Sequence, residues 1–212
     1  MPTRTLLLLI SAVFAGGCAT AEPRPADGDK NPDGDKSATS TGAGGNVVEA
    51  SAQIPVDESA ATEVIEEKYP SGELWKRVEG KRTKTGEFVP HGVTTTWYES
   101  GLKWSEINFR NGVKHGPKRT WYTTGAEWSY GSFDDDIEDG TWTTYHPNGE
   151  KAREWHMDRG VWDGTYTEWH PNGRKRMEVT FVRGLRQGAM KIYDENGAVA
   201  AVTDFIDGIE QP

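Results

Sequence analysis

Apolar residues recur along most of the chain in short runs that are separated by turn-forming residues. The first turn of each unit ends in a glycine, and these glycines are spaced by 24 residues, at Gly101, Gly125, Gly149, Gly173 and Gly197. A second turn follows eleven residues after each of them, at Gly112, Asp136, Gly160, Gly184 and Gly208. The runs between turns are about seven to nine residues long, which is short for a helix and typical of a strand. Each unit therefore predicts a β-hairpin, and the chain predicts an array of hairpins.

Large apolar side chains occupy the same columns of successive units. Eight residues after the first-turn glycine stand Phe109, Phe133, Met157, Phe181 and Phe205, and twelve after it stand Val113, Ile137, Val161, Leu185 and Ile209. Such residues suit a pleated, half-buried surface, and their cross-strand pairs hold a thin sheet together. We predict an all-β fold: an extended single-layer antiparallel sheet of about six 24-residue hairpin repeats, beginning with a degenerate unit at Gly72.

Composition agrees with a sheet that has little central core. The 212 residues include 25 glycines and nine tryptophans, and every tryptophan lies between Trp75 and Trp169. The formal net charge is −9, of which residues 18–61 carry −5 and residues 69–212 carry −3. Neither part offers the large basic patch that nucleic acid or an anionic lipid surface requires, so we expect no nucleic-acid partner.

Residues 1–17 have the pattern of a secretory signal. Arg4 supplies a basic start, Leu6–Ile10 begins an apolar run, and small residues precede Cys18, the one cysteine of the chain. The apolar run is too short for a comfortable transmembrane helix.

The small residues before Cys18 resemble a bacterial lipobox, in which the signal is cut before the cysteine and the cysteine is lipidated. This resemblance implies a membrane anchor at Cys18, and Ala19 after it favours the outer membrane. The alternative is an ordinary cleaved signal followed by a chance cysteine. We expect a lipid-anchored protein of the cell envelope, on the periplasmic or the outer surface.

Residues 18–61 are predicted to form a tether between the anchor and a domain of residues 62–212. The segment has no aromatic residue and is rich in Ala, Gly, Pro, Ser, Thr and Asp, so it cannot bury enough surface to order itself. Asp29–Gly34 matches the first half of a calcium loop, but Ser40 stands at the twelfth position and no helix flanks it, which favours a solvated linker. Val64–Tyr69 predicts either a first short strand or a helical turn.

The units resemble the MORN-like repeat of the YwqK-type antitoxin family. One unit carries the pattern as Tyr98-Glu99-Ser100-Gly101, Glu106, Phe109, Asn111-Gly112 and His115-Gly116. The resemblance covers residues 69–212 and implies a long twisted antiparallel sheet of roughly eleven or twelve strands. It also implies neutralisation of a toxin as one function, although a shared fold does not establish a shared function.

No catalytic or metal-binding set emerges from the sequence, and we expect neither an enzyme nor a cofactor. Four of the five histidines fall in repeat columns, His91 with His115 and His146 with His170, which favours structural roles. Glu106, Glu154 and Glu178 share another column, which predicts a surface ladder with basic neighbours. The acidic cluster Asp134–Asp139 predicts either a solvated turn or a cation site.

One aromatic column is interrupted. Three residues after the first-turn glycine stand Trp75, Trp104 and Trp128, followed by Ala152, Arg176 and Ala200 in the later units, and Tyr130 lies two residues beyond Trp128. Because side chains alternate along a strand, this column is expected on the face opposite Phe109 and Phe133. Trp75, Trp104, Trp128 and Tyr130 are then either a docking strip for a protein, peptide or glycan, or aromatics that only cover the sheet.

The functional expectation is a non-enzymatic cell-envelope lipoprotein whose repeat sheet binds or scaffolds an unknown protein partner. Two alternatives remain: an antitoxin-like or immunity-like protein, and an envelope glycan-binding protein. The last unit stops after its second turn, and an uncovered edge strand there would permit self-association.

Overall fold

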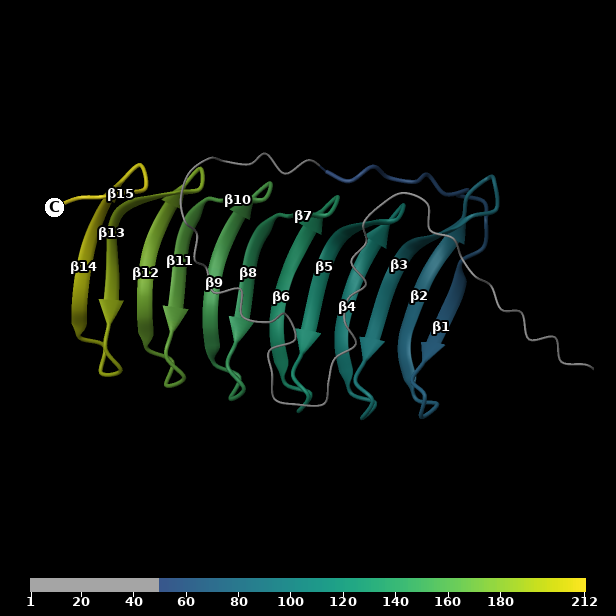
Figure 1. Ribbon diagram of the computed structural model, residues 1–212, viewed down its shortest axis with the longest axis horizontal. Helices are drawn as coiled ribbons and strands as arrows, with labels where there is room; N and C mark the ends of the chain where they lie inside the picture. The colour runs from purple at the N-terminus through teal and green to yellow at the C-terminus, as the bar shows by residue number, and fades with distance from the viewer. Residues whose placement is uncertain (1–49) are drawn as a thin grey trace, which may run out of the picture.

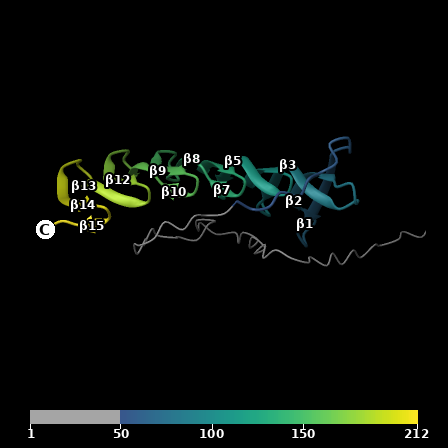
Figure 2. The ribbon, with the colours of Figure 1, turned by 90° about the horizontal axis from the view of Figure 1, so that it is seen from above.

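The computed structural model describes residues 50–212, and their regular structure consists only of β-strands. They form one open antiparallel sheet in which the long strands follow one another in chain order (Figure 1). The sheet is long and narrow when it is seen from above (Figure 2), and the predicted fold class is confirmed. The strands are β1 (Glu63–Lys68), β2 (Leu74–Arg82), β3 (Phe88–Trp97), β4 (Lys103–Arg110), β5 (Val113–Trp121), β6 (Glu127–Asp134), β7 (Ile137–Glu138), β8 (Gly140–Tyr145), β9 (Lys151–Asp158), β10 (Val161–Trp162), β11 (Gly164–Trp169), β12 (Lys175–Val182), β13 (Leu185–Tyr193), β14 (Val199–Ile206) and β15 (Ile209–Glu210).

Several expectations concern the N-terminal region. The signal at residues 1–17, Cys18 and the Asp29–Gly34 motif lie outside the described residues. Within residues 50–212, no helix could cross a membrane. The Val64–Tyr69 region forms a strand, β1, which pairs antiparallel with β2.

The second turn is a two-residue hairpin turn in every unit after the first, whereas the first unit has a longer loop between Arg82 and Phe88. Asn111 and Gly112 have φ angles of 50° and 85°, the two positive values that a type I′ turn requires. In the third unit Asp135 and Asp136 adopt φ angles of 48° and 69°, so an aspartate takes the glycine position. The other predicted turn glycines also have positive φ: Gly101, Gly125, Gly149, Gly160, Gly173, Gly184 and Gly197.

A β-bulge follows the first turn of each unit. Thr96 pairs with Ser105 and Trp97 pairs with Lys103, so Trp104 is an extra residue without a partner in the register. A bulge of this kind breaks the alternation of side chains between the two faces. The same shift makes bulge residues of Trp75, Trp128, Ala152, Arg176 and Ala200.

One face of the sheet carries a line of stacked rings, and we call it the aromatic face. Phe133 meets Trp142 edge-on at 5.2 Å between ring centroids, and Trp142 stacks on Trp155 at 6.1 Å. The line continues from Trp155 to Trp162 at 5.9 Å and from Trp162 to Phe181 at 5.2 Å. A single-layer sheet thus obtains its apolar packing from neighbouring rings.

The opposite face, which we call the polar face, carries repeated ion pairs. Each joins a lysine to the glutamate three residues later, in the Glu column that the sequence singles out: Lys103–Glu106, Lys151–Glu154 and Lys175–Glu178. Pairs this exposed contribute little stability each, so this face is a solvated surface.

Side-chain hydrogen bonds fasten each unit to the next along the first-turn edge. Hydroxyls of Tyr69, Tyr98 and Tyr122 donate to main-chain carbonyls in the following unit. In the later units His146 and His170 make the equivalent bond through Nε2. Main-chain bonds do the same on the second-turn edge: Gly112 to Pro90, Asp136 to Lys114, Gly160 to Glu138, Gly184 to Trp162 and Gly208 to Arg186.

Part of the expected tether lies against the sheet. The amide of Ile54 donates to Asn111 and the amide of Asp57 to Arg82, so the segment follows the second-turn edge (Figure 1). Val56 is buried, and Gln53 donates to the Asp135 carboxylate at 2.8 Å. An apolar side chain and paired amides therefore attach residues 53–57 to the sheet, although the composition of this segment alone predicts disorder.

Candidate binding pocket on the aromatic face

The four aromatic residues predicted as a docking strip do not lie together. Trp75 and Trp104 are 6% and 5% exposed and stack on each other at 5.8 Å between ring centroids. With Tyr69 and Tyr98 they form a buried cluster. This pair therefore covers the sheet, as the second interpretation of the column proposes, and leaves little surface for a partner.

Tyr130 lies on the other face from the tryptophan column. It pairs with Arg119 and Thr143 across the sheet, and the Arg119 guanidinium sits 5.2 Å from its ring centroid. Its neighbour Ser129 pairs with Thr144 on the aromatic face. Tyr130 is 38% exposed and belongs to the polar face.

The expectation that the tryptophan column opposes Phe133 is wrong. Thr144 follows Trp142 by two residues and Arg153 precedes Trp155 by two, so both point to the aromatic face. Trp128 lines the same pocket as Thr144 and Arg153. The bulge explains the error, because its extra residue shifts the alternation by one.

Trp128 lines a pocket with a volume of about 340 Å³. It is half-buried, and Tyr122 meets it edge-on at 6.5 Å between ring centroids. The next residue of its column is Ala152, whose small side chain leaves the hollow open. The lining residues come from β6, β8, β9, β11 and β12 and from the turns after β5 and β8: Tyr122, Trp128, Thr144, Tyr145, His146, Ala152, Arg153, Glu168, Trp169 and Arg176.

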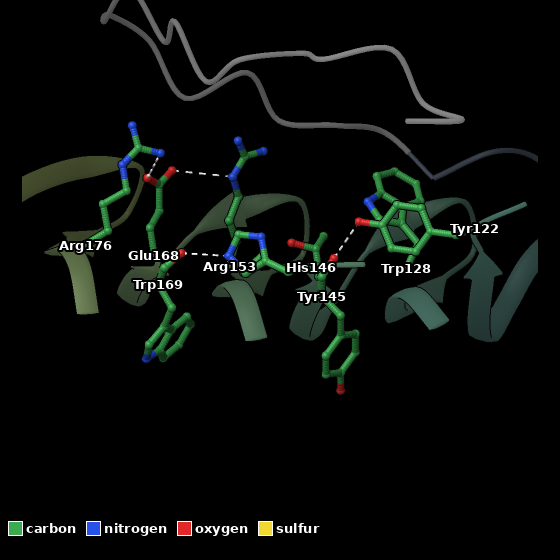
Figure 3. A pocket seen from close by; sticks show the side chains of 10 residues that line it. Tyr122, Trp128, Tyr145, His146, Arg153, Glu168, Trp169 and Arg176 are labelled. Carbon is green, nitrogen blue, oxygen red and sulfur yellow. Dashed lines mark hydrogen bonds and ion pairs between the residues drawn. The ribbon is translucent and has the colours of Figure 1, made fainter. Parts of the chain in front are cut away.

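Main chain forms part of the pocket lining. The Tyr122 hydroxyl donates to the carbonyl of Tyr145 at 2.7 Å, and His146 Nε2 lies 2.9 Å from the carbonyl of Trp169. Figure 3 shows the Tyr145 and Trp169 side chains pointing away from the arginines, so these two residues contribute backbone. The hydrogen bonds fix the distance between the units on either side of the pocket.

An ion-pair network occupies one end of the pocket. Arg153 Nε lies 3.4 Å from one carboxylate oxygen of Glu168, and Arg176 Nη1 lies 3.4 Å from the other (Figure 3). The Tyr166 hydroxyl also donates to Glu168. Burial first, and this carboxylate second, raise the pKa of Tyr166 above its ordinary value, so Tyr166 is a neutral donor.

The network carries an excess of positive charge. Two guanidinium groups share one carboxylate, and Glu168 is only 14% exposed while Arg153 and Arg176 are 42% and 59% exposed. The arginines therefore keep donor groups available to a ligand, whereas the carboxylate is enclosed. Planar guanidinium groups are well suited to bind carboxylates.

The sequence contained signals for this pocket that the aromatic pattern did not reveal. The replacement of tryptophan by Ala152 and Arg176 interrupts the column. A second row crosses the sheet as Thr96, Ser105, Thr120, Ser129 and Thr144, and then changes to Arg153 and Glu168. The change from hydroxyl side chains to charged side chains in this row coincides with the position of the pocket.

The acidic cluster of the third unit has structural partners. Asp136 accepts from the Lys114 amide and Asp139 from the Arg159 amide. Asp135 accepts from Gln53 and Arg110, although His115, Asp134 and Asp135 place possible metal ligands within 4.8 Å of one another. The bonds to Asp135 give this cluster a role in holding the segment before β1.

The repeat pattern has a counterpart among known families. Residues 138–158 and 162–183 match the MORN repeat variant. These two stretches contain Tyr145, Arg153, Glu168 and Arg176 of the pocket. No curated protein matches the chain. The match supports a MORN-like repeat protein, and the other units repeat the bulge after the first turn that the matched ones have.

Proposed function

We propose that this protein is a non-enzymatic cell-envelope lipoprotein whose MORN-like sheet binds a protein partner at the Trp128 pocket. MORN repeats are consistent with a protein-binding or scaffolding module. The observation that carries the proposal is the pocket itself, where an indole, an open hollow and two partly exposed arginines lie together. Aromatic and arginine side chains are those that contribute most at protein interfaces.

The proposal of a binding protein, in place of an enzyme, rests on how the polar groups are used. His146 and His170 donate to carbonyls, and His115 and His91 contact residues of neighbouring turns. Glu168 bonds three side chains that hold it in place. Histidine and glutamate side chains that are held in such hydrogen bonds and ion pairs are better suited to a structural role than to proton transfer.

The proposal of an envelope location rests on the sequence. A basic start, an apolar run and small residues before Cys18 favour export and lipidation. We propose an outer-membrane anchor, with a chain segment that allows the sheet to reach its partner. Stable anchoring requires more than one acyl chain, which lipidation of the lipobox type supplies.

The test is capture from envelope extract with the full chain as bait, beside Trp128→Ala and Tyr130→Ala. Both variants remove one aromatic side chain, and Tyr130 lies on the polar face, so it is a matched control. A single protein retained in stoichiometric amount by wild type and Tyr130→Ala, but lost by Trp128→Ala, is the expected result. Retention by all three baits would place the interface elsewhere and overturn the pocket as the site.

The YwqK-type resemblance supplies one rival identity for the partner, a toxin or effector that the protein neutralises. A captured partner that arrests growth when expressed alone, and does not when this chain is co-expressed, would favour that identity. A saturable change of tryptophan fluorescence with saccharides, together with an empty capture lane, would instead favour the envelope glycan-binding alternative.

A further inference from the structure

The pocket lies where the repeat pattern places a tryptophan and the sequence has an alanine. Trp75 and Trp104, the bulge residues of the first two units, lie against each other with their indoles stacked at 5.8 Å between ring centroids. Ala152 holds the bulge position after Trp128. A ring supplied from outside could therefore lie against Trp128 in the way that Trp104 lies against Trp75.

The volume agrees with an occupant of a few side chains. About 340 Å³ is at the small end of the range for ligand pockets. The space suits one aromatic side chain with a neighbouring group, and the sheet on either side offers a surface along which an extended segment could continue. An aromatic ring gains from offset or edge contacts with an indole in addition to its burial.

The positive charge of the pocket favours a ligand that carries a negatively charged group beside its aromatic ring. Arg153 and Arg176 together face the single carboxylate of Glu168, with exposed donor groups left over. Among the pocket-lining residues Glu168 is the only acidic one. A second carboxylate from a ligand would balance the second guanidinium and could be bound through two parallel hydrogen bonds.

We infer, on the basis of the proposed function, that the pocket receives an aromatic side chain of the partner protein together with an adjacent aspartate or glutamate. The ring lies against Trp128 above Ala152, and the carboxylate binds Arg176 and Arg153. The partner presents this pair on an exposed or extended segment, since the pocket is shallow enough to expose both arginines.

The experiment is selection of a random dodecapeptide library, displayed on phage, against the full immobilised chain. The expected result is enrichment of sequences with Trp, Tyr or Phe within two residues of Asp or Glu. Enriched peptides that lack the aromatic residue or the acidic residue would overturn the inference. It would also be overturned if the peptides selected on the wild-type chain bound it no better than they bind Ala152→Trp.

Two substitutions in one column provide the decisive comparison. Ala152→Trp restores the repeat residue and fills the pocket, so the enriched peptide should bind at least tenfold more weakly. Ala200→Trp makes the same change at the bulge of β14, away from the pocket, and should leave binding within twofold of wild type. Equal binding to both variants would overturn the inference.

Arg176→Ala changes an exposed side chain and should weaken binding of the peptide about tenfold. It provides a second test that does not depend on how Ala152→Trp folds.

The failure of this inference differs from the failure of the proposed function. If envelope capture depends on Trp128 but the library shows no aromatic–acidic preference, the partner-binding function stands and the chemistry assigned to its ligand is wrong. If capture is insensitive to Trp128, the proposed site fails first. Binding of purified peptidoglycan fragments that Ala152→Trp abolishes, with no peptide selected, would overturn both in favour of a glycan.

Discussion

The Tyr122 hydroxyl donates a 2.7 Å hydrogen bond to the main-chain carbonyl of Tyr145, which lies 23 residues later in the chain. His146, the next residue of the Tyr122 column, repeats the bond to Trp169 at the same separation. A phenol and an imidazole can replace each other here because each offers one donor at the end of a planar ring. The bond spans the lining of the pocket and so sets the distance across it.

Removal of such a hydroxyl should weaken the sheet measurably. Tyr98 is 2% exposed and donates to the carbonyl of Trp121 at 2.7 Å. Tyr98→Phe leaves that acceptor without its donor, and we expect a loss of about 1–2 kcal/mol in the free energy of unfolding, measured by urea denaturation. Tyr130→Phe, at an exposed ring, should change it by less than about 0.5 kcal/mol. Equal losses in the two variants would contradict a structural role for the ladder.

A glycine beneath Trp142 should not tolerate even a methyl group. A Cβ on Gly131 would lie 2.1 Å from Cδ2 of the Trp142 ring. Gly131→Ala should displace Trp142 from its stack with Trp155 and destabilise the protein by about 1–3 kcal/mol, with a reduced near-ultraviolet circular dichroism signal. Ser132→Ala, one residue along on the polar face, is the control. An unchanged aromatic signal in Gly131→Ala would show that the stack does not need this close contact.

The turn of the fourth unit offers a stabilising change. Arg159 precedes Gly160 with a φ angle of 46°, and Asn111 occupies the same position in the second unit with a φ angle of 50°. Asparagine adopts this conformation more readily than arginine, and the Arg159 side chain is 88% exposed. Arg159→Asn should raise the free energy of unfolding by about 0.5–1 kcal/mol. Arg159→Ala should lower it, and the opposite order in thermal unfolding would show that the turn does not limit stability.

The Tyr166 phenol should make stability depend on alkaline pH. Its pKa is raised above the ordinary value of 10.0, by burial first and by Glu168 second. A raised folded-state pKa gives a contribution that is full below the unfolded-state pKa and is lost as pH rises through the folded-state pKa. Stability should therefore decline above about pH 10. Tyr166→Phe should flatten this decline, and Glu168→Gln should lower the pKa of Tyr166, as followed by phenolate absorbance against Tyr166→Phe. An unchanged titration in Glu168→Gln would contradict the electrostatic part of the shift.

The proposed anchor can be tested at one position because Cys18 is the only cysteine. Incorporation of labelled palmitate should occur in the wild-type chain and be absent in Cys18→Ser. The variant should also leave the membrane fraction when cells are fractionated. Exported Cys18→Ser that remained with membranes to the same extent would indicate attachment through the sheet or its partner.

The strands and turns were predictable because the relevant physics is local. The Asn111–Gly112 pair predicts a two-residue hairpin turn, and the spacing of the turns limits the length of the strands between them. The bulge was not predictable from alternation, since one extra residue in every unit leaves the 24-residue period unchanged. Alternation alone therefore places Trp104 and Trp128 on the face opposite Phe133.

The pocket could be predicted only in part. Trp128 was identified from its column, and Ala152 and Arg176 were visible as departures from it. Arg153 and Glu168 become neighbours through pairing between β9 and β11, which no property of either strand alone reveals. The contacts of Gln53 with Asp135 likewise join residues 82 positions apart, beyond the reach of a composition argument.

The hydrogen bonds along the two edges have a consequence for how such a protein can change in length. Each of these bonds joins one unit to its immediate neighbour, so none of them depends on the total number of units in the sheet. Insertion or deletion of a complete unit would preserve every remaining junction and alter the span by two strand spacings, roughly 10 Å. The length of the sheet can therefore change in steps of one unit. Duplication of a unit in the gene could change the distance between the pocket and either end of the sheet without altering the pocket residues.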